Sequence, residues 1–209
     1  MRGTMTRSTT VQAVLGQLRR DIITEKFDDG TPVKEILFAE EYNCSRAALR
    51  GALIVLEQEG LIKVLPNGTK TISLLSKDDI NNLYELRNYV ECTAVKQLLQ
   101  KENMDISHLI GVLEEAKKNP DINFYDSDAM FHEMLIKLSG NKALMQVWKN
   151  LIPVMRELFI INCSRKKSIS ESLEERHLLI AKLLFERDKK AVEELSKHIE
   201  EARILSIGK

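Results

Sequence analysis

Residues 43–60 read NCSRAALRGALIVLEQEG, and this stretch decides the fold of the N-terminal part of the chain. Apolar residues recur in it at the spacing that forms one stripe along a helix: Leu49, Ala52, Leu53 and Leu56. Ser45 is a good N-cap because its hydroxyl can accept a backbone N–H, and Gly60 supplies a left-handed C-terminal stop. Arg46 and Arg50 lie four residues apart, so they share a face away from the stripe. The stretch predicts a short helix with one buried face and two arginines near its start.

Two short runs rich in Ile, Val and Thr follow this helix, at residues 61–65 and 69–73. Pro66-Asn67-Gly68 separates them, and an Asn-Gly pair favours a hairpin because both residues tolerate positive φ. Upstream, residues 11–24 and 36–42 predict two further helices. The order helix, helix, turn, helix, two-stranded wing is that of a winged helix-turn-helix, whose third helix enters a DNA major groove. Arginines on a helix surface are more often simply solvated, so the arginines alone indicate DNA binding only weakly.

Over roughly residues 10–75 the chain resembles the GntR family of bacterial transcriptional regulators. The residues that carry the resemblance are Val11, Leu18-Arg19, Ile22, Gly30, Ala39-Glu40, Ser45-Arg46, Arg50, Ala52-Leu53, Leu56, Glu59-Gly60-Leu61 and Pro66-Asn67-Gly68. The resemblance implies six DNA-contacting positions on the recognition helix and the wing tip: Ser45, Arg46, Ala47, Arg50, Asn67 and Gly68. Ala47, Ala48 and Gly51 depart from the family pattern of Thr-Pro or Thr-Thr followed by Glu. The missing hydroxyl groups bear on the operator sequence and on affinity, not on the fold.

The composition is that of an ordinary globular protein, with 209 residues of which 44% are hydrophobic. The 31 basic and 31 acidic residues cancel, so DNA affinity requires a local basic patch. Candidates for that patch are Arg46, Arg50, Lys63 and Lys70. No apolar run is long enough for a membrane helix, and residues 1–10 lack a signal-peptide core, so we expect a cytoplasmic protein. The three scattered cysteines predict no disulfide framework.

We expect a flexible leader at residues 1–10, a winged helix-turn-helix DNA-binding domain at 11–75 and an all-helical domain at 76–209. The helical domain shows no strand pattern and no internal repeat. Its six predicted helices span residues 78–101, 106–118, 124–138, 142–166, 169–187 and 189–205. Six helices form a bundle large enough for its own core. The predicted fold class is therefore mainly α, with three helices and a β-hairpin wing followed by an all-α six-helix bundle.

Potential metal ligands in the helical domain are one aspartate and three histidines. Asp128 and His132 lie four apart on one predicted helix, so both side chains project from the same face. His177 lies eleven residues before Asp188 and His198 ten residues after it, and the last two helices turn near Asp188. In an antiparallel hairpin the two imidazoles therefore come to the same height. Such donors suit zinc, nickel, manganese or iron without distinguishing among them. Single histidines on helices are more often surface or core residues, and the spacing leaves the two interpretations about equal.

Residues 80–205 resemble the FCD domain, the effector-binding domain of the FadR subfamily of GntR regulators. The matching residues are Glu85-Leu86-Arg87, Glu91, Asp128, Phe131-His132, Gly140-Asn141, His177, Ile180, Asp188, Ala191 and His198. The resemblance implies that a divalent transition metal has four ligands: Asp128, His132, His177 and His198. It also implies that the metal holds a small carboxylate effector, and six helices resemble the VanR-like branch.

Two arginines are candidate effector-binding residues. Arg87 lies in the Glu-Leu-Arg motif, and its guanidinium can meet a ligand carboxylate. A salt bridge from Arg87 to Glu91, four residues on, is an equally good explanation. Arg156 points into the same bundle in some registers.

The leading interpretation is a ligand-responsive transcriptional regulator that binds a pseudo-palindromic double-stranded operator as a homodimer. A small organic acid bound at the metal would set the affinity for DNA. A metal-dependent enzyme is one alternative, because an open metal site can activate water. A regulator whose metal is purely structural is the other. The sequence offers no further acid or base beside the ligands, so we expect no catalytic residue.

Overall fold

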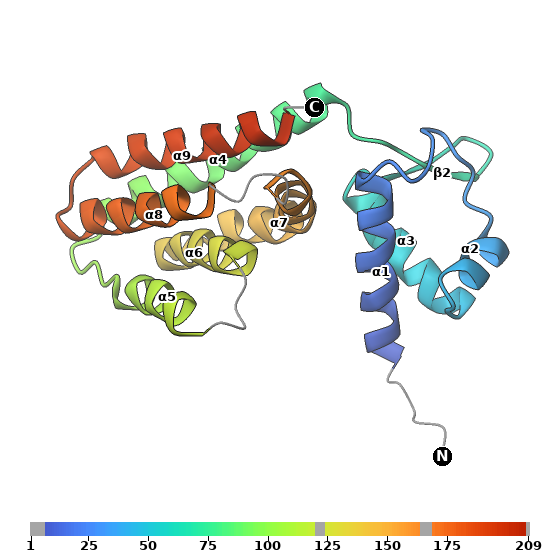
Figure 1. The fold of residues 1–209 in the computed structure, drawn as a ribbon, viewed down its shortest axis with the longest axis horizontal. Coiled ribbons are helices and arrows are strands. Elements are labelled where there is room, and N and C mark those ends of the chain that lie inside the picture. The colour runs from blue at the N-terminus through green and yellow to red at the C-terminus, as the bar shows by residue number, and fades with distance from the viewer. Residues whose placement is uncertain (1–6, 120–123, 164–168, 208–209) are drawn as a thin grey trace, which may run out of the picture. The chain divides into compact units, whose positions relative to one another are not determined.

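The computed structural model describes residues 7–119, 124–163 and 169–207 (Figure 1). The chain divides into two compact units, Met1–Ser76 and Lys77–Lys209. The first unit holds three helices and a two-stranded antiparallel sheet, and the second holds six helices among its described residues. The predicted fold class is therefore confirmed. Within the described part of the chain, no helix is both long enough and apolar enough to cross a membrane.

The first unit is a winged helix-turn-helix. Its elements are, in chain order, α1 (Arg7–Ile23), α2 (Glu35–Glu41), α3 (Arg46–Gln58), β1 (Ile62–Val64) and β2 (Lys70–Ile72). The apolar stripe predicted on α3 is fully buried and packs against α1. Ser45 caps α3 by accepting the Ala48 N–H at 3.1 Å, and Gly60 ends the segment with a φ of +77°. The sequence signals at both ends of the helix thus act as predicted.

Helix α1 begins at Arg7, four residues before its predicted start and within the predicted leader. From Val11 onwards, where the side chains of α1 are described, Val14 is the first that is buried. The sequence of residues 7–10 contains no Pro or Gly, the residues that interrupt a helix most strongly. Residues 1–6 of the predicted leader lie outside the described residues.

The wing is a short antiparallel hairpin in which Ile62 pairs with Ile72. Asn67 accepts the Thr69 N–H at 3.0 Å, and Gly68 has a φ of +80°, as an Asn-Gly turn requires. The segment before α2 is attached to this hairpin, because the Val33 N–H donates to the Lys70 carbonyl at 2.8 Å. The wing therefore also holds the backbone that leads into α2.

A bidentate ion pair connects α1 to Glu59, the residue that follows α3. The Arg19 Nε lies 2.8 Å from one Glu59 oxygen and its Nη2 lies 2.7 Å from the other. Both side chains are largely buried, so the pair is geometrically well defined. This contact holds the third helix in a fixed position within its unit.

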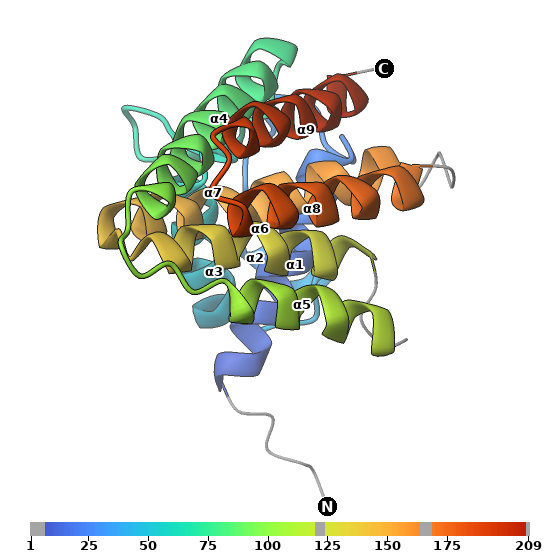
Figure 2. The same cartoon turned by 90° about the vertical axis from the view of Figure 1, so that its left-hand side faces the viewer.

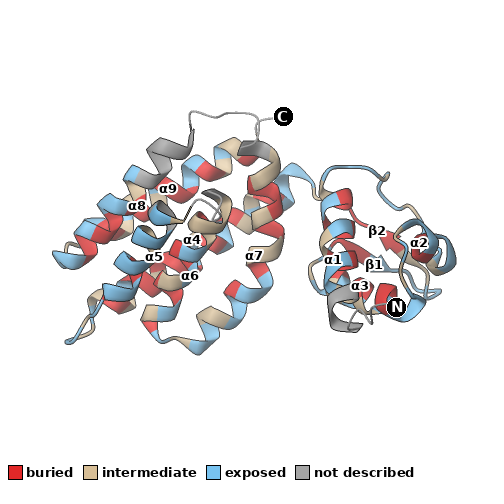
Figure 3. Ribbon diagram, turned by 60° about the horizontal axis from the view of Figure 1, so that its bottom comes forward, coloured by how far each residue is buried: buried red, intermediate tan, exposed pale blue. Residues whose placement is uncertain are grey.

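The second unit is a helical bundle. Its elements are α4 (Lys77–Leu99), α5 (Ser107–Lys118), α6 (Phe124–Ser139), α7 (Lys142–Cys163), α8 (Ile169–Phe185) and α9 (Lys190–Ile207). Helix α4 packs against α6, α7 and α9, and α8 lies beside α9 (Figures 1 and 2). Burial follows the inward sides of the helices (Figure 3). All six predicted helices are present, and residues 164–166 of the fourth lie outside the described residues.

Candidate metal centre and nucleic-acid interface

Three helices of the second unit bring the four predicted metal ligands together. Helix α6 supplies Asp128 and His132, α8 supplies His177 and α9 supplies His198. All four side chains are buried, and one potential ligand atom from each lies within 4.8 Å of all the others. The four side chains therefore converge, as the sequence predicts from the spacing on α6 and from the matched heights on α8 and α9.

The distances between the donor atoms fit a metal ion. The Nε2 atom of His198 lies 3.0 Å from that of His132 and 3.1 Å from that of His177. The Asp128 Oδ1 lies 3.3 to 3.8 Å from the same three nitrogens. Donors arranged tetrahedrally around zinc at 2.0–2.1 Å would lie about 3.3 Å from one another. The cluster can therefore surround a cation without a large rearrangement.

Burial and neighbouring charges give the members of the cluster different protonation states. Burial lowers the pKa of His198 to about 3, with His132 and His177 acting in the same direction, and burial lowers the pKa of His177 as well. Burial would raise the pKa of Asp128, but His132 and the hydrogen bonds from the imidazoles outweigh it and hold that pKa well below its usual value. His177 and His198 are therefore neutral and Asp128 is ionised, the forms that bind metals. Burial would lower the pKa of His132, but Glu91 and Asp128 outweigh it and raise that pKa, so a metal would have to displace a proton from His132.

Aromatic packing orients one of the ligands. The ring of Phe131, which is fully buried, stacks on the imidazole of His177 with their centroids 4.1 Å apart and their planes at 19°. Phe131 directly precedes His132 on α6, so the helix that supplies two ligands also orients a third. This contact keeps the His177 ring nearly parallel to the Phe131 ring.

Glu91 of α4 is a supporting residue that sequence reasoning identified only as a partner for Arg87. Its carboxylate is fully buried, with one oxygen 2.5 Å from the Nδ1 of His132 and the other 2.7 Å from the Nε of Arg87. Burial would raise the pKa of Glu91, but His132 and Arg87 outweigh it and lower that pKa to about 2. A carboxylate that accepts the Nδ1–H of a histidine leaves Nε2 available for a metal. Glu91 therefore holds the Nδ1 side of His132 and directs its Nε2 toward the cluster.

The two candidate effector-binding arginines both have carboxylate partners. Arg87 is buried and makes the predicted salt bridge to Glu91, and its guanidinium carbon lies 5.9 Å from the centroid of the Trp148 ring. Arg156 lies on α7 and is about one-third exposed, with its Nε 3.0 Å from Asp126. Arg87 is thus next to the ligand cluster through Glu91, whereas the contacts of Arg156 lead to the start of α6. Effector binding by either residue stays a prediction.

The outward face of α3 and the tip of the wing form the candidate nucleic-acid interface. The six predicted positions are all exposed: Ser45, Arg46, Ala47, Arg50, Asn67 and Gly68. Of the three departures from the family pattern, Ala48 is buried, and a Cβ on Gly51 would lie 3.4 Å from the Val11 side chain. Ala47 therefore changes the exposed surface, Ala48 lies in the interior, and a side chain at the partly exposed Gly51 would contact α1.

Carboxylates neutralise much of the predicted basic patch. Arg46 and Arg50 are both more than half exposed, yet both reach the carboxylate of Glu35 on α2. Lys70 pairs with Glu57. Sequence reasoning did not identify Glu35, because no local spacing links it to the arginines eleven and fifteen residues later.

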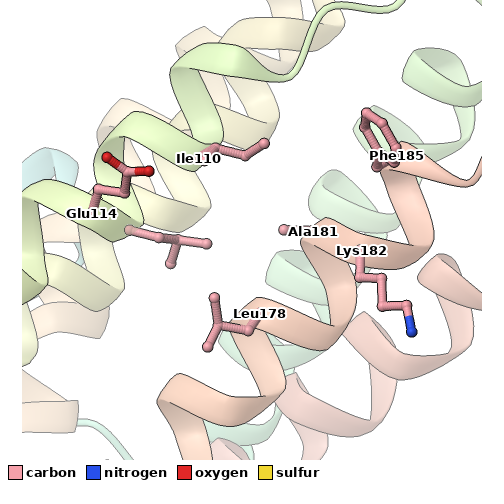
Figure 4. Close-up of a pocket in the computed structure, with 7 residues that line it drawn as sticks. Ile110, Glu114, Leu178, Ala181, Lys182 and Phe185 are labelled. Atoms are coloured by element: carbon pink, nitrogen blue, oxygen red, sulfur yellow. The ribbon is translucent and has the colours of Figure 1, made fainter.

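A separate apolar pocket of about 480 Å³ lies between α5 and α8 (Figure 4). Its lining residues are Ile110, Leu113, Glu114, Leu178, Ala181, Lys182 and Phe185. None of them is a predicted site residue, and none belongs to the Asp and His cluster. The pocket therefore adds nothing to the candidate metal centre.

Two family models match the chain. The model of the FCD domain matches residues 82–201, and that of the gntR family of bacterial regulatory proteins matches residues 10–70. The gluconate operon transcriptional repressor of Bacillus licheniformis is 28% identical over 195 residues, which cover 88% of this chain and 79% of that protein. The transcriptional repressor RspR of Escherichia coli K12 is 26% identical over 198 residues, covering 91% and 86%.

A solved structure extends the similarity to the fold of the whole chain. The Listeria monocytogenes protein Lar superposes with a TM-score of 0.73 at 19% identity, covering 99% of this chain and 98% of that one. At this identity the likeness concerns the fold alone. Fold and sequence comparisons thus agree on an N-terminal winged helix-turn-helix followed by an FCD bundle.

Proposed function

The chain belongs to the GntR family of transcriptional regulators and carries an FCD domain, and from this premise we propose that a small organic acid bound at a metal centre controls its affinity for an operator. We propose that the protein is cytoplasmic and acts as a homodimer. Its relatives are named as transcriptional regulators, which disfavours an enzymatic role. No catalytic residue is therefore proposed.

The observation that carries the proposal is the convergence of Asp128 Oδ1 and three histidine Nε2 atoms inside the bundle. These four residues would hold zinc, nickel, manganese or iron. Asp128 supplies a charged oxygen, and burial keeps His177 and His198 in the neutral form that binds metal. A bound ion that accepts more than four ligands would supply positive charge and an open coordination position for a carboxylate. Glu91 would orient His132 toward that ion.

The effector class follows from the chemistry of the site. A carboxylate oxygen is a good ligand for the proposed metals, and Arg87 places a buried positive charge next to the cluster. We propose Arg87 and Arg156 as the residues that contact the remaining polar groups of the effector. The relative from Bacillus licheniformis is named for a gluconate operon, and gluconate carries both a carboxylate and hydroxyl groups. Hydroxy-acids are therefore the first compounds to test.

Thermal unfolding of the full chain tests the metal and the effector together. We expect a hydroxy-acid to raise the unfolding midpoint of metal-loaded protein and to leave chelator-treated protein unchanged. A ligand present at a hundred times its Kd stabilises by about 2.7 kcal/mol, which corresponds to several degrees. The panel consists of mono-, di- and hydroxy-carboxylates, with uncharged polyols as controls. A large loss of stability on chelation without a shift from any acid would make the metal purely structural.

The DNA-binding part of the proposal rests on the exposed face of α3. A two-fold dimer would place two copies of this helix on a pseudo-palindromic operator, since a two-fold protein reads two-fold DNA. Arg46 and Arg50 are the basic residues of α3, and Asn67 and Gly68 lie at the wing tip that would contact the backbone. Ser45 and Ala47 complete the exposed start of the helix.

We expect Arg50→Ala to weaken binding to the operator by about 1–3 kcal/mol, the range for a good base contact. Fluorescence anisotropy with a labelled operator duplex measures this loss directly. The control is Arg203→Ala on α9, which also removes an ion-paired arginine but lies in the helical unit. Equal affinities of the two variants would refute a base contact by Arg50.

A further inference from the structure

One carboxylate lies between the two arginines of the proposed recognition helix. Glu35, the first residue of α2, has both oxygens within 3.0 Å of the Arg50 Nε, and one of them lies 2.8 Å from the Arg50 Nη2. The same oxygen is 3.6 Å from the Nη2 of Arg46. Glu35 is only partly exposed, whereas both arginines are more than half exposed. The contact therefore links α2 to the outward face of α3.

The backbone before Glu35 is held in place by a hydrogen bond to the wing, and the Glu35 carboxylate reaches from it to the arginines. The Val33 N–H donates to the Lys70 carbonyl at 2.8 Å, which attaches the start of α2 to the wing. The hydrogen bond from Arg50 keeps the pKa of Glu35 below its usual value, so the carboxylate stays charged at neutral pH. A charged group on a fixed backbone restricts the rotamers of its partner.

Glu35 engages one edge of the Arg50 guanidinium and leaves the other directed away from it. A guanidinium carries five N–H donors in a planar fork, and the Nε and Nη2 edge is the one that Glu35 contacts. The end formed by the two terminal nitrogens can still make a bidentate contact with guanine. An arginine held in this way has lost much of its rotamer freedom before it meets DNA, so less is lost on binding.

The same carboxylate opposes sequence-independent binding. Phosphate contacts account for most non-specific affinity, and they depend on the local positive charge. The chain has no net charge, so each carboxylate within the patch matters for that affinity. Glu35 lies against both arginines, where it lowers the positive potential that any duplex would meet.

We propose that Glu35 is a specificity-determining residue of the DNA interface, which positions Arg50 for base contact and suppresses binding to unrelated DNA. The inference rests on the proposed DNA-binding function. Its two effects act on different quantities: positioning raises affinity for the operator, and charge lowers affinity for every other sequence. Discrimination between operator and unrelated DNA then arises from a favourable contact with the operator and from an unfavourable charge against every other sequence.

The test compares Glu35→Gln with Glu41→Gln in the full-length protein. Glu41 lies on the same helix and pairs with Lys26, so its substitution changes the charge equally without touching an arginine of α3. Wild-type protein first selects duplexes from a random-sequence pool. Affinity for a selected duplex and for a scrambled duplex is then measured over a range of salt concentrations.

For Glu35→Gln we expect tighter binding to the scrambled duplex and a salt dependence steeper by about one unit, as one more phosphate contact gives. The ratio of the two affinities should fall about tenfold, within the range for one impaired base contact. Equal ratios and slopes for Glu35→Gln and Glu41→Gln would overturn the proposal. A wild-type protein that enriches no sequence would instead refute the DNA-binding function itself.

A shorter carboxylate separates positioning from folding. Glu35→Asp keeps the charge but cannot hold Arg50 at the same distances, so it should retain the weak binding to the scrambled duplex and lose affinity for the selected one. Thermal midpoints of all variants are compared with that of Glu41→Gln. If Glu35→Gln lowers the thermal midpoint, the positioning role is judged from Glu35→Asp instead. An unchanged affinity of Glu35→Asp for the selected duplex overturns that role.

Discussion

His177→Ala is expected to lower metal affinity by more than about 100-fold, beyond the range seen when only an outer-shell partner of a ligand is lost. The substitution removes one of four donors and leaves a cavity where the imidazole Nε2 lay 3.1 Å from that of His198. Metal content after exhaustive dialysis, followed by competition with a chromogenic chelator, measures the loss. His132→Ala should behave in the same way, because its Nε2 lies 3.0 Å from the same atom.

The matched control for these variants is His108→Ala. His108 lies on α5, is exposed and does not belong to the ligand cluster, so the same chemical change should leave the metal content intact. His177→Ala also removes the ring that stacks on Phe131, which lowers stability independently of metal. The variants are therefore compared with wild-type protein in chelator as well. Full metal occupancy in both His132→Ala and His177→Ala would rule out the proposed constellation.

The convergence of Asp128 with the three histidines could be predicted from the sequence because helix geometry is regular. Asp128 and His132 share a face through their spacing, and each residue of a helix advances by about 1.5 Å, so eleven and ten residues from the turn near Asp188 both correspond to about 16 Å. The hairpin of α8 and α9 then brings His177 and His198 to one level. The heights of these side chains therefore follow from helix geometry alone, without knowledge of tertiary contacts.

The supporting carboxylates could not be predicted in the same way. Glu91 lies 41 residues before His132, and Glu35 lies 15 residues before Arg50. The helical period shows which residues share a face but not which other helix packs against that face. The early start of α1 at Arg7 has a different cause, since a polar sequence without a helix breaker can continue either as helix or as coil. Tertiary packing, not local pattern, determined the first two features.

Glu91→Gln is expected to weaken metal binding by about 10- to 100-fold, although Glu91 is not itself a ligand. The substitution preserves the volume of the side chain but removes the charge that accepts the His132 Nδ1–H and that pairs with Arg87. His132 would lose the partner that fixes its tautomer, and its Nε2 would less often present a lone pair to the cluster. Isothermal titration with zinc in a competing chelator measures the change. Glu114→Gln, an exposed and charge-matched substitution on α5, is the control.

The same substitution should destabilise the bundle by about 3–5 kcal/mol, because removing one partner of a buried ion pair leaves Arg87 as an uncompensated charge. The double variant Arg87→Met, Glu91→Gln removes both charges, so we expect it to regain most of that stability while its metal affinity stays low. This separation distinguishes orientation of His132 from general support of the fold. Zinc affinity that recovers together with stability in the double variant would show that Glu91 acts only through folding.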